Sequence, residues 1–143
     1  MYTTGTMTNA RVLVVDDDAA TRAMMVEVMS AVGLTASTSE SAEEALAVIR
    51  AGNVDLIVLD VQLPKMSGLE LVKEIRQDPK LRTTPILLVS GHTSSRAIVD
   101  AFASGADDFV VKPFRAPELA ARIFSLLLQL QRTRAQTSAP PAP

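Results

Sequence analysis

The 143-residue sequence contains no cysteine, no tryptophan and a single histidine, His92. Without cysteine the chain can form no disulfide scaffold, no thiolate metal site and no cysteine nucleophile. His92 follows Ser90 by two positions in an expected loop, and we expect its side chain to be solvated. A metal ion bound by this chain would therefore be held by oxygen atoms.

The sequence also lacks a strong charge of either sign, a long apolar run and a secretory signal. Its formal net charge is −2 and its isoelectric point is near 5.4, so it has no global attraction to nucleic acid or to an anionic membrane. No apolar run approaches the roughly 20 residues that span a bilayer. The first ten residues, MYTTGTMTNA, have neither a basic start nor an apolar stretch. These features predict a cytoplasmic protein with no direct nucleic-acid binding and no membrane association.

What is present is the composition of one globular domain. Apolar residues make up 48% of the chain and charged residues 21%, a balance that allows a sizeable core. Apolar periodicity ends near Gln131, and the remaining sequence is rich in proline and alanine. We therefore predict a flexible segment at 1–9, a folded domain at 10–131, and a disordered tail or truncated linker at 132–143.

Short apolar runs alternate with segments whose apolar residues recur every three or four positions. This alternation is typical of βαβ units around a parallel sheet, and the doubly apolar run LIVL indicates a central strand covered by helices on both faces. Ser41 with Glu44 forms a capping-box pattern, while Gly33, Gly52 and Gly105 stand where helices should end. The predicted strands are 11–15, 34–38, 55–59, 85–89 and 108–111.

Polar side chains follow four of these strands, at the point where each strand ends. Because the carboxyl ends of parallel strands meet at one edge of a sheet, side chains spread over a hundred positions should converge there in one crevice. These residues are Asp16, Asp17 and Asp18 after the first strand, Asp60 after the third, Ser90 after the fourth and Lys112 after the fifth.

Such a crevice has the parts needed for phosphoryl chemistry. Clustered carboxylates repel one another unless a cation lies among them, and oxygen ligands favour a hard ion such as Mg²⁺ (or Mn²⁺). Lys112 would supply a positive charge and Ser90 a hydroxyl donor, as a phosphoryl group requires. A carboxylate between them could be the nucleophile.

Each residue alone has a structural alternative. An aspartate after a strand often caps the next helix, which we expect of Asp18. Lys112 before Pro113 could be an ordinary residue at a strand end, and Ser90 before Gly91 an ordinary turn. Their joint placement favours the functional interpretation.

Four segments of the chain resemble the response-regulator receiver family of two-component signalling, in which chemotaxis regulators are found. These segments are VLVVDDD, DLIVLDVQLPKMSG, LLVSGH and GADDFVVKPF, and the similarity extends from about Ala10 to Leu130. The resemblance implies a flavodoxin-like (βα)5 fold with a parallel sheet in the order 2-1-3-4-5. Two helices should cover one face of that sheet and three the other.

The resemblance also implies roles for individual residues. Asp60 would be the phosphoacceptor, and Mg²⁺ would bind Asp17, Asp60 and the backbone carbonyl of Gln62, with Asp16 acting through water. Lys112 and Ser90 would contact the phosphoryl group, and the peptide bond between Lys112 and Pro113 should be cis.

Ser90 and Phe109 are similar to the family's switch pair, with Phe109 in place of a frequent tyrosine and Gly91 in place of a frequent alanine. The segments GADDF and ELAARI resemble the dimer face of DNA-binding regulators. The residues of that face are Asp107, Asp108 and Arg122, whereas Ile98 and Asp100 stand near where a basic partner is expected.

The resemblance implies a signalling module rather than an enzyme. A histidine kinase or a histidine phosphotransfer protein would phosphorylate Asp60, and the altered surface would control a protein partner or a fused output domain. We expect a monomer or a weak, phosphorylation-dependent homodimer.

Two alternatives are a phosphatase resembling the haloacid dehalogenase group and an unphosphorylated pseudo-receiver. Gln62, where the phosphatase needs a second acid, disfavours the first, and the complete set of site residues disfavours the second.

Overall fold

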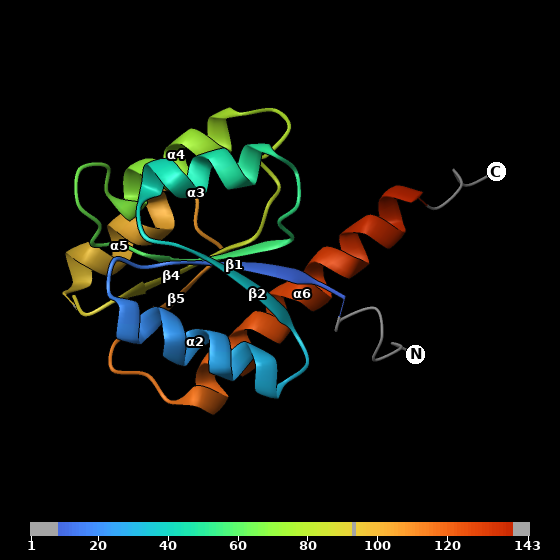
Figure 1. Ribbon diagram of the computed structural model, residues 1–143. Coiled ribbons are helices and arrows are strands. Elements are labelled where there is room, and N and C mark those ends of the chain that lie inside the picture. The colour runs from blue at the N-terminus through green and yellow to red at the C-terminus, as the bar shows by residue number, and fades with distance from the viewer. Residues whose placement is uncertain (1–8, 93, 139–143) are drawn as a thin grey trace.

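The computed structural model describes residues 9–92 and 94–138 as alternating strands and helices (Figure 1). Five parallel strands form one sheet in the order β2-β1-β3-β4-β5, as predicted. The strands are β1 (Arg11–Val15), β2 (Thr35–Ser39), β3 (Leu56–Asp60), β4 (Ile86–Ser90) and β5 (Asp108–Val111). The helices are α2 (Ala19–Ala31), α3 (Ala42–Arg50), α4 (Gly68–Gln77), α5 (Ser95–Ala103) and α6 (Ala116–Ser138).

The predicted bounds of β1 and β5 are confirmed, whereas β2, β3 and β4 each lie one residue further along the chain. Leu34 does not begin β2 because its N–H bonds back to the carbonyl of Met29, 2.9 Å away, and so closes the end of α2. Asp60 and Ser90 belong to their strands because Asp60 pairs with Val89 and Ser90 pairs with Val111. Both side chains are therefore held by a regular sheet backbone.

The sheet separates two layers of helices (Figure 1), and each layer packs apolar side chains against it. On one face, Met25 and Met29 of α2 and Ile123 of α6 pack against strand residues such as Val14 and Val58. On the other face, α3, α4 and α5 pack against the alternate strand residues, with Ile75 and Ala101 among the buried contacts. The predicted division into two and three helices is confirmed, and burial on both faces makes the central strand β3 buried throughout.

The predicted helix signals are also found. Asp18 caps α2 by accepting a hydrogen bond from the Thr21 N–H at 2.9 Å, and Ser41 caps α3 in the same way through the Glu44 N–H at 3.1 Å. Gly33, Gly52 and Gly105 have positive φ angles, a conformation that favours glycine at a helix end.

Helix α6 corrects the predicted end of ordered structure at residue 131, because it continues through Ser138. The end of the apolar period was read as the end of the helix. Residues 132–135 of this extension are instead exposed, and Arg134 holds it to the body of the domain through an ion pair with Asp55, 3.2 Å away. Residues 1–8 and 139–143 lie outside the described residues. Within the described part of the chain, none of the helices combines the length and apolarity needed to cross a membrane.

Candidate functional site: an acidic crevice at the carboxyl edge of the sheet

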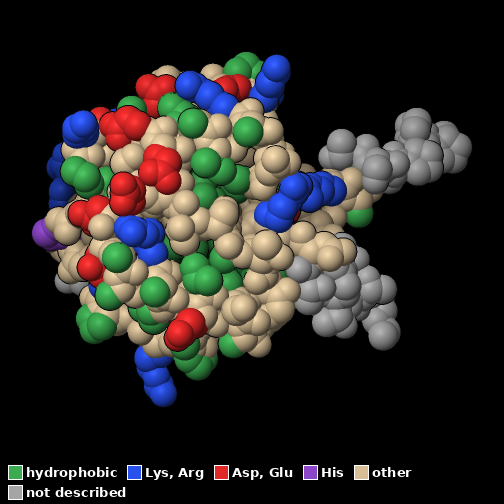
Figure 2. Space-filling model, viewed as in Figure 1, with side chains coloured by type: hydrophobic (Ala, Val, Ile, Leu, Met, Phe, Trp, Pro, Cys, Tyr) green, Lys and Arg blue, Asp and Glu red, His purple; other side chains and the backbone are tan. Residues whose placement is uncertain are grey.

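The predicted site residues converge at the edge where the strands end. Asp16, Asp60 and Ser90 are buried, with exposed fractions of 1%, 7% and 1%. Lys112 crosses to them from the loop after β5, and its Nζ lies 2.9 Å from Asp16 Oδ2 and 3.0 Å from Asp60 Oδ2. Acidic side chains also gather on the surface toward this end of the molecule, at the left of the view in Figure 2.

Three carboxylates come close enough to share a cation. One ligand oxygen from each of Asp16, Asp17 and Asp60 lies within 4.8 Å of the others, and the Asp17 side chain is on the solvent side of the group. Oxygen donors of this kind fit Mg²⁺, which takes one or two carboxylates and keeps several waters. The third aspartate of the run, Asp18, is instead occupied as the cap of α2.

Asp60 lies in a setting that favours its neutral form. Burial raises the pKa of Asp60 above the ordinary value of 3.8, and the charge of Asp16 acts in the same direction. The Gln62 N–H, 2.9 Å from Oδ1, and Lys112 oppose this rise. A cation that joined Lys112 would therefore favour the ionised carboxylate, which is the nucleophilic form.

Lys112 is charged despite being partly buried. Burial alone would lower the pKa of Lys112, but the hydrogen bonds to Asp16 and Asp60 outweigh it and raise the pKa above 10.5. The Lys112 N–H donates to the Ser90 carbonyl at 2.8 Å, and the following bond to Pro113 is cis, as expected. The hydrogen bond to Ser90 holds the lysine backbone beside β4, and the ammonium group extends toward the carboxylates.

Ser90 and His92 border the crevice on the side of β4. The Ser90 hydroxyl accepts a hydrogen bond from the His92 N–H at 3.1 Å. The His92 ring is exposed, as predicted, and contacts the side-chain amide of Gln62. Gln62 therefore spans the site, since its backbone N–H bonds to Asp60 while its side chain reaches the β4 loop.

Phe109 and the predicted dimer-face charges lie outside the crevice. The Phe109 ring is half-buried and packs against the layer that contains Ala101. Asp108 pairs with Arg122 at 3.0 Å within this chain, and Asp107 pairs with Arg76 at 2.9 Å. A polar partner for each of these acids is thus already supplied by the chain itself.

Sequence reasoning missed two residues that shape the site. Arg22 donates from Nη1 to the Asp16 carbonyl at 2.7 Å. Gly68, the last residue of the segment DLIVLDVQLPKMSG, lies so close to β3 that an added Cβ would be 2.3 Å from the Asp60 carbonyl oxygen. A signal for Arg22 was its place in the first turn of the helix after the acidic run, since helical side chains point back toward the N-terminus.

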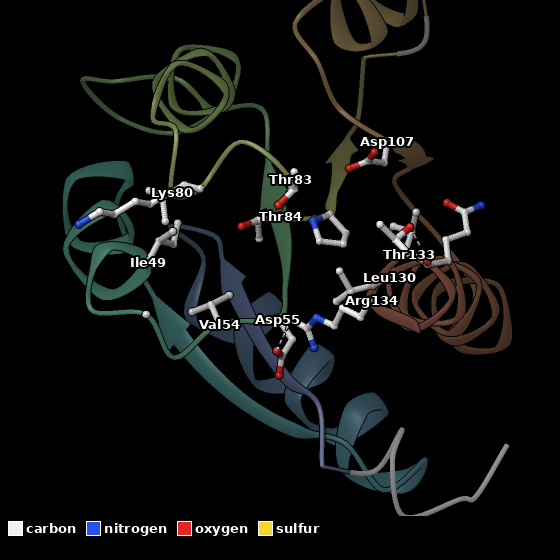
Figure 3. Close-up of a pocket in the computed structure, with 15 residues that line it drawn as sticks. Ile49, Val54, Asp55, Lys80, Thr83, Thr84, Asp107, Leu130, Thr133 and Arg134 are labelled. Atoms are coloured by element: carbon white, nitrogen blue, oxygen red, sulfur yellow. Dashed lines mark hydrogen bonds and ion pairs between the residues drawn. The ribbon is translucent and has the colours of Figure 1, made fainter. Parts of the chain in front are cut away.

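A second concavity lies at the opposite edge of the sheet. It has a volume of about 660 Å³ and is bordered by the amino ends of the central strands and the last turns of α6 (Figure 3). Its two acids are engaged, Asp55 with Arg134 and Asp107 with Arg76. The convergent carboxylates and Lys112 lie at the other edge, and we assign the chemistry there.

The fold and this site define a class of protein. A model of the response regulator receiver domain matches residues 12–124, and the chain belongs to that family of signalling modules. Receiver domains of this family act in two-component systems, and the aspartate cluster fits their phosphoacceptor site.

Individual relatives agree with this assignment. The chain is 39% identical over 133 residues to the transcriptional regulatory protein YvrH of Bacillus subtilis, covering 92% of this chain and 55% of the relative. It is 35% identical over 113 residues to the DNA-binding response regulator MtrA of Mycobacterium tuberculosis, covering 79% and 48%. The chain thus spans about half the length of these relatives.

Among solved structures, the chemotaxis response regulator CheY4 of Vibrio cholerae matches with a TM-score of 0.78 and 33% identity, covering 82% of this chain and 98% of that chain. A CheY-like receiver domain protein from Methanospirillum hungatei matches with a TM-score of 0.80 and 28% identity, covering 87% and 98%. Receiver domains therefore match nearly the whole folded part of this chain.

Proposed function

We propose that Asp60 is the phosphoacceptor of this receiver domain. A carboxylate oxygen of Asp60 attacks the phosphorus of a phosphohistidine on a histidine kinase or a histidine phosphotransfer protein. An O–P bond forms, the P–N bond breaks, and the released imidazole takes a proton from solvent. The observation that carries this proposal is the position of the Asp60 carboxylate, 3.0 Å from Lys112 at the same sheet edge as Ser90 and Asp16.

We infer that Mg²⁺ or Mn²⁺ is the cofactor. Asp17, Asp60 and the backbone carbonyl of Gln62 would hold it directly, with Asp16 acting through water. The ion supplies positive charge that offsets the charge of the transferred phosphoryl group. The clustering of three carboxylates within 4.8 Å supports this assignment.

The remaining residues of the crevice have distinct roles in this proposal. Lys112 neutralises phosphoryl oxygens, and the Ser90 hydroxyl donates to one of them. Ser90 and Phe109 together report phosphorylation to the outer surface. The domain promotes its own phosphotransfer and slow dephosphorylation, but it does not turn over a separate substrate.

The partners in this proposal follow from that role. The phosphoryl donor is a histidine kinase or phosphotransfer protein of the cytoplasm. The signal then passes from this domain to a protein partner or a fused output domain. As expected from the net charge of −2, we propose no direct role for this chain in binding nucleic acid or a membrane. Because Asp108 and Arg122 already pair within the chain, we favour a monomer or a weak homodimer that forms on phosphorylation.

Phosphorylation by acetyl phosphate and Mg²⁺ tests the assignment of Asp60. The wild type should gain one phosphoryl group, about 80 Da by intact mass, whereas Asp60→Asn should not. Asp100→Asn on α5 is the matched control, since Asp100 pairs with Arg96 at the surface and is not a member of the acidic cluster. Equal labelling of wild type and Asp60→Asn would contradict the assignment.

A further inference from the structure

Arg22 connects the first turn of α2 to the acidic run that precedes it. Its Nη1 donates to the Asp16 carbonyl at 2.7 Å, and its side chain is only 19% exposed. The other terminal nitrogen lies 3.9 Å from Glu40 Oε2, whose own side chain is 69% exposed. The bond to the carbonyl is therefore the short, shielded contact, and the ion pair with Glu40 is the weaker one.

The carbonyl that Arg22 holds belongs to the peptide that joins Asp16 to Asp17. Rotation of this peptide would turn the Cα–Cβ bond of Asp17 and so move its carboxylate relative to Asp16 and Asp60. Asp16 itself is fixed by other contacts: its N–H bonds to Ser39, and its carboxylate accepts from Asp18 N–H and Lys112. The side chain of Arg22 restrains the peptide group between Asp16 and Asp17.

The charge of Arg22 is also placed to support the acidic group. Lys112 neutralises the crevice from the side of β5, while Arg22 lies on the side of α2. An arginine suits this position because its planar fork can donate to a carbonyl and face a carboxylate at the same time, which a lysine ammonium does less well. Neither contact involves the ligand atoms of the acids themselves.

We propose that Arg22 is a positioning residue for the metal site. By holding the Asp16–Asp17 peptide, it keeps the Asp17 carboxylate turned toward Asp16 and Asp60, and it thereby sets the affinity for Mg²⁺ without touching the ion. This proposal rests on the proposed metal site of the receiver domain. Groups that orient a ligand in this way typically change metal affinity by about tenfold or more when they are removed.

The test is the dissociation constant for Mg²⁺ of the full chain without any phosphoryl donor, measured from the amide chemical shifts of Asp17 and Gln62. Arg22→Met, which keeps side-chain length but removes the donors, should bind Mg²⁺ about tenfold more weakly. Arg22→Lys, which keeps the charge and can donate to the carbonyl but lacks the planar fork, should recover part of the affinity. Glu40→Gln should stay within about threefold of wild type, because the exposed ion pair contributes little.

Arg11→Met is the matched control, since it removes an arginine that pairs with Asp55 at the opposite, amino-terminal edge of the sheet. Its Mg²⁺ affinity should equal that of the wild type. If Arg22→Met folds poorly, Arg22→Gln carries the same expectation, because its shorter neutral side chain cannot reach the carbonyl in the same geometry.

Two results would overturn the proposal, and they are distinguishable. Wild-type affinity in folded Arg22→Met or Arg22→Gln, together with weak binding by Asp17→Asn, would show that Asp17 is a ligand that Arg22 does not position. No Mg²⁺ response in the wild type itself would overturn the metal site, and the role of Arg22 with it.

Discussion

Lys112 donates a hydrogen bond from Nζ to Asp60 Oδ2 at 3.0 Å, across a separation of 52 residues. The same ammonium group bonds to Asp16 at 2.9 Å, so one cation holds two carboxylates that would otherwise repel each other. This pairing compensates only part of the negative charge, because the Asp17 carboxylate lies within the same group. The crevice therefore keeps negative charge that Lys112 does not compensate, which is consistent with the proposed metal site.

Mg²⁺ alone should stabilise the folded chain. A ligand that binds only the folded state adds RT ln(1 + [L]/Kd), about 1.4 kcal/mol when the ion is at ten times its Kd. Asp17→Asn should lose most of this gain, measured as the rise in melting temperature with Mg²⁺. Asp18→Asn is the control: it alters the adjacent cap of α2 and should keep the response. An undiminished response in Asp17→Asn would exclude Asp17 as a ligand.

Asp60→Asn should raise the melting temperature at pH 7 in the absence of Mg²⁺. Burial raises the pKa of Asp60 in the folded state above 3.8, so between pH 3.8 and that folded value the folded state holds more protons than the unfolded state. Through that window the free energy of unfolding contributed by Asp60 falls as pH rises, and at neutral pH the charged carboxylate is a net cost.

The advantage of the variant should therefore shrink as pH falls toward 3.8, where wild-type Asp60 becomes protonated. Thermal unfolding from pH 7.5 down to 4.5 measures this trend. With Mg²⁺ present the wild type should gain more stability than the variant. An Asp60→Asn protein that melts below the wild type at neutral pH without metal would refute this electrostatic account.

Gly68→Ala should be strongly destabilising, whereas Gly91→Ala should be nearly neutral. A Cβ at Gly68 would lie 2.3 Å from the Asp60 carbonyl oxygen and 2.8 Å from Val61 Cα, both backbone atoms that cannot move without shifting β3. Relieving this clash should cost about 3 kcal/mol, at the upper end of overpacking effects.

A Cβ at Gly91 meets nothing within 4 Å, so Gly91→Ala should stay within roughly 0.5 kcal/mol of wild type. Urea denaturation compares the two variants directly. Equal stability of the two alanine variants would mean that the close approach of α4 to the end of β3 does not constrain the site.

Ser90→Ala should still accept a phosphoryl group at Asp60 but should fail to transmit the signal to β5 and α5. In our proposal a phosphoryl group draws the Ser90 hydroxyl toward it, which opens space beside β5 for the Phe109 ring. Because that ring is already half-buried, it should gain less than the roughly 1.5–3 kcal/mol of complete burial. When fluoroberyllate, a phosphate mimic, is added, the wild type should show NMR chemical-shift changes at Ala101, Phe102 and Phe109. Ser90→Ala should lose these changes.

Phe109→Leu provides the matched comparison, since it keeps an apolar side chain but lacks the ring that would turn inward. It should bind fluoroberyllate and show reduced changes on α5. If Ser90→Ala gives wild-type shift changes at all three positions, the signal does not pass through this pair.

The order of the elements and the members of the site could be predicted because both follow from local patterns. Short apolar runs and helical stripes are short-range signals, and the rule that parallel strands end at one edge brings Asp16, Asp60, Ser90 and Lys112 together without further information. The cap formed by Asp18 and the positive φ of Gly105 were equally local.

Other features depended on contacts between distant segments. Apolar periodicity could not predict that α6 continues to Ser138, because residues 132–135 are exposed and the extension is held by the pair of Arg134 and Asp55, 79 residues apart. The start of β2 lies one residue later than predicted for a related reason: the Leu34 N–H bonds to the carbonyl of Met29 at the end of α2.

The residue types that can bind Mg²⁺ and accept a phosphoryl group were thus determined by the sequence alone. Only the tertiary structure decided how they are held: Arg22 on the Asp16 carbonyl, Gly68 against the Asp60 backbone, and Lys112 between two carboxylates. The physical reason is that a residue type and its spacing specify which bonds a side chain can make. The partner that a side chain meets depends on how segments far apart in the chain pack against one another.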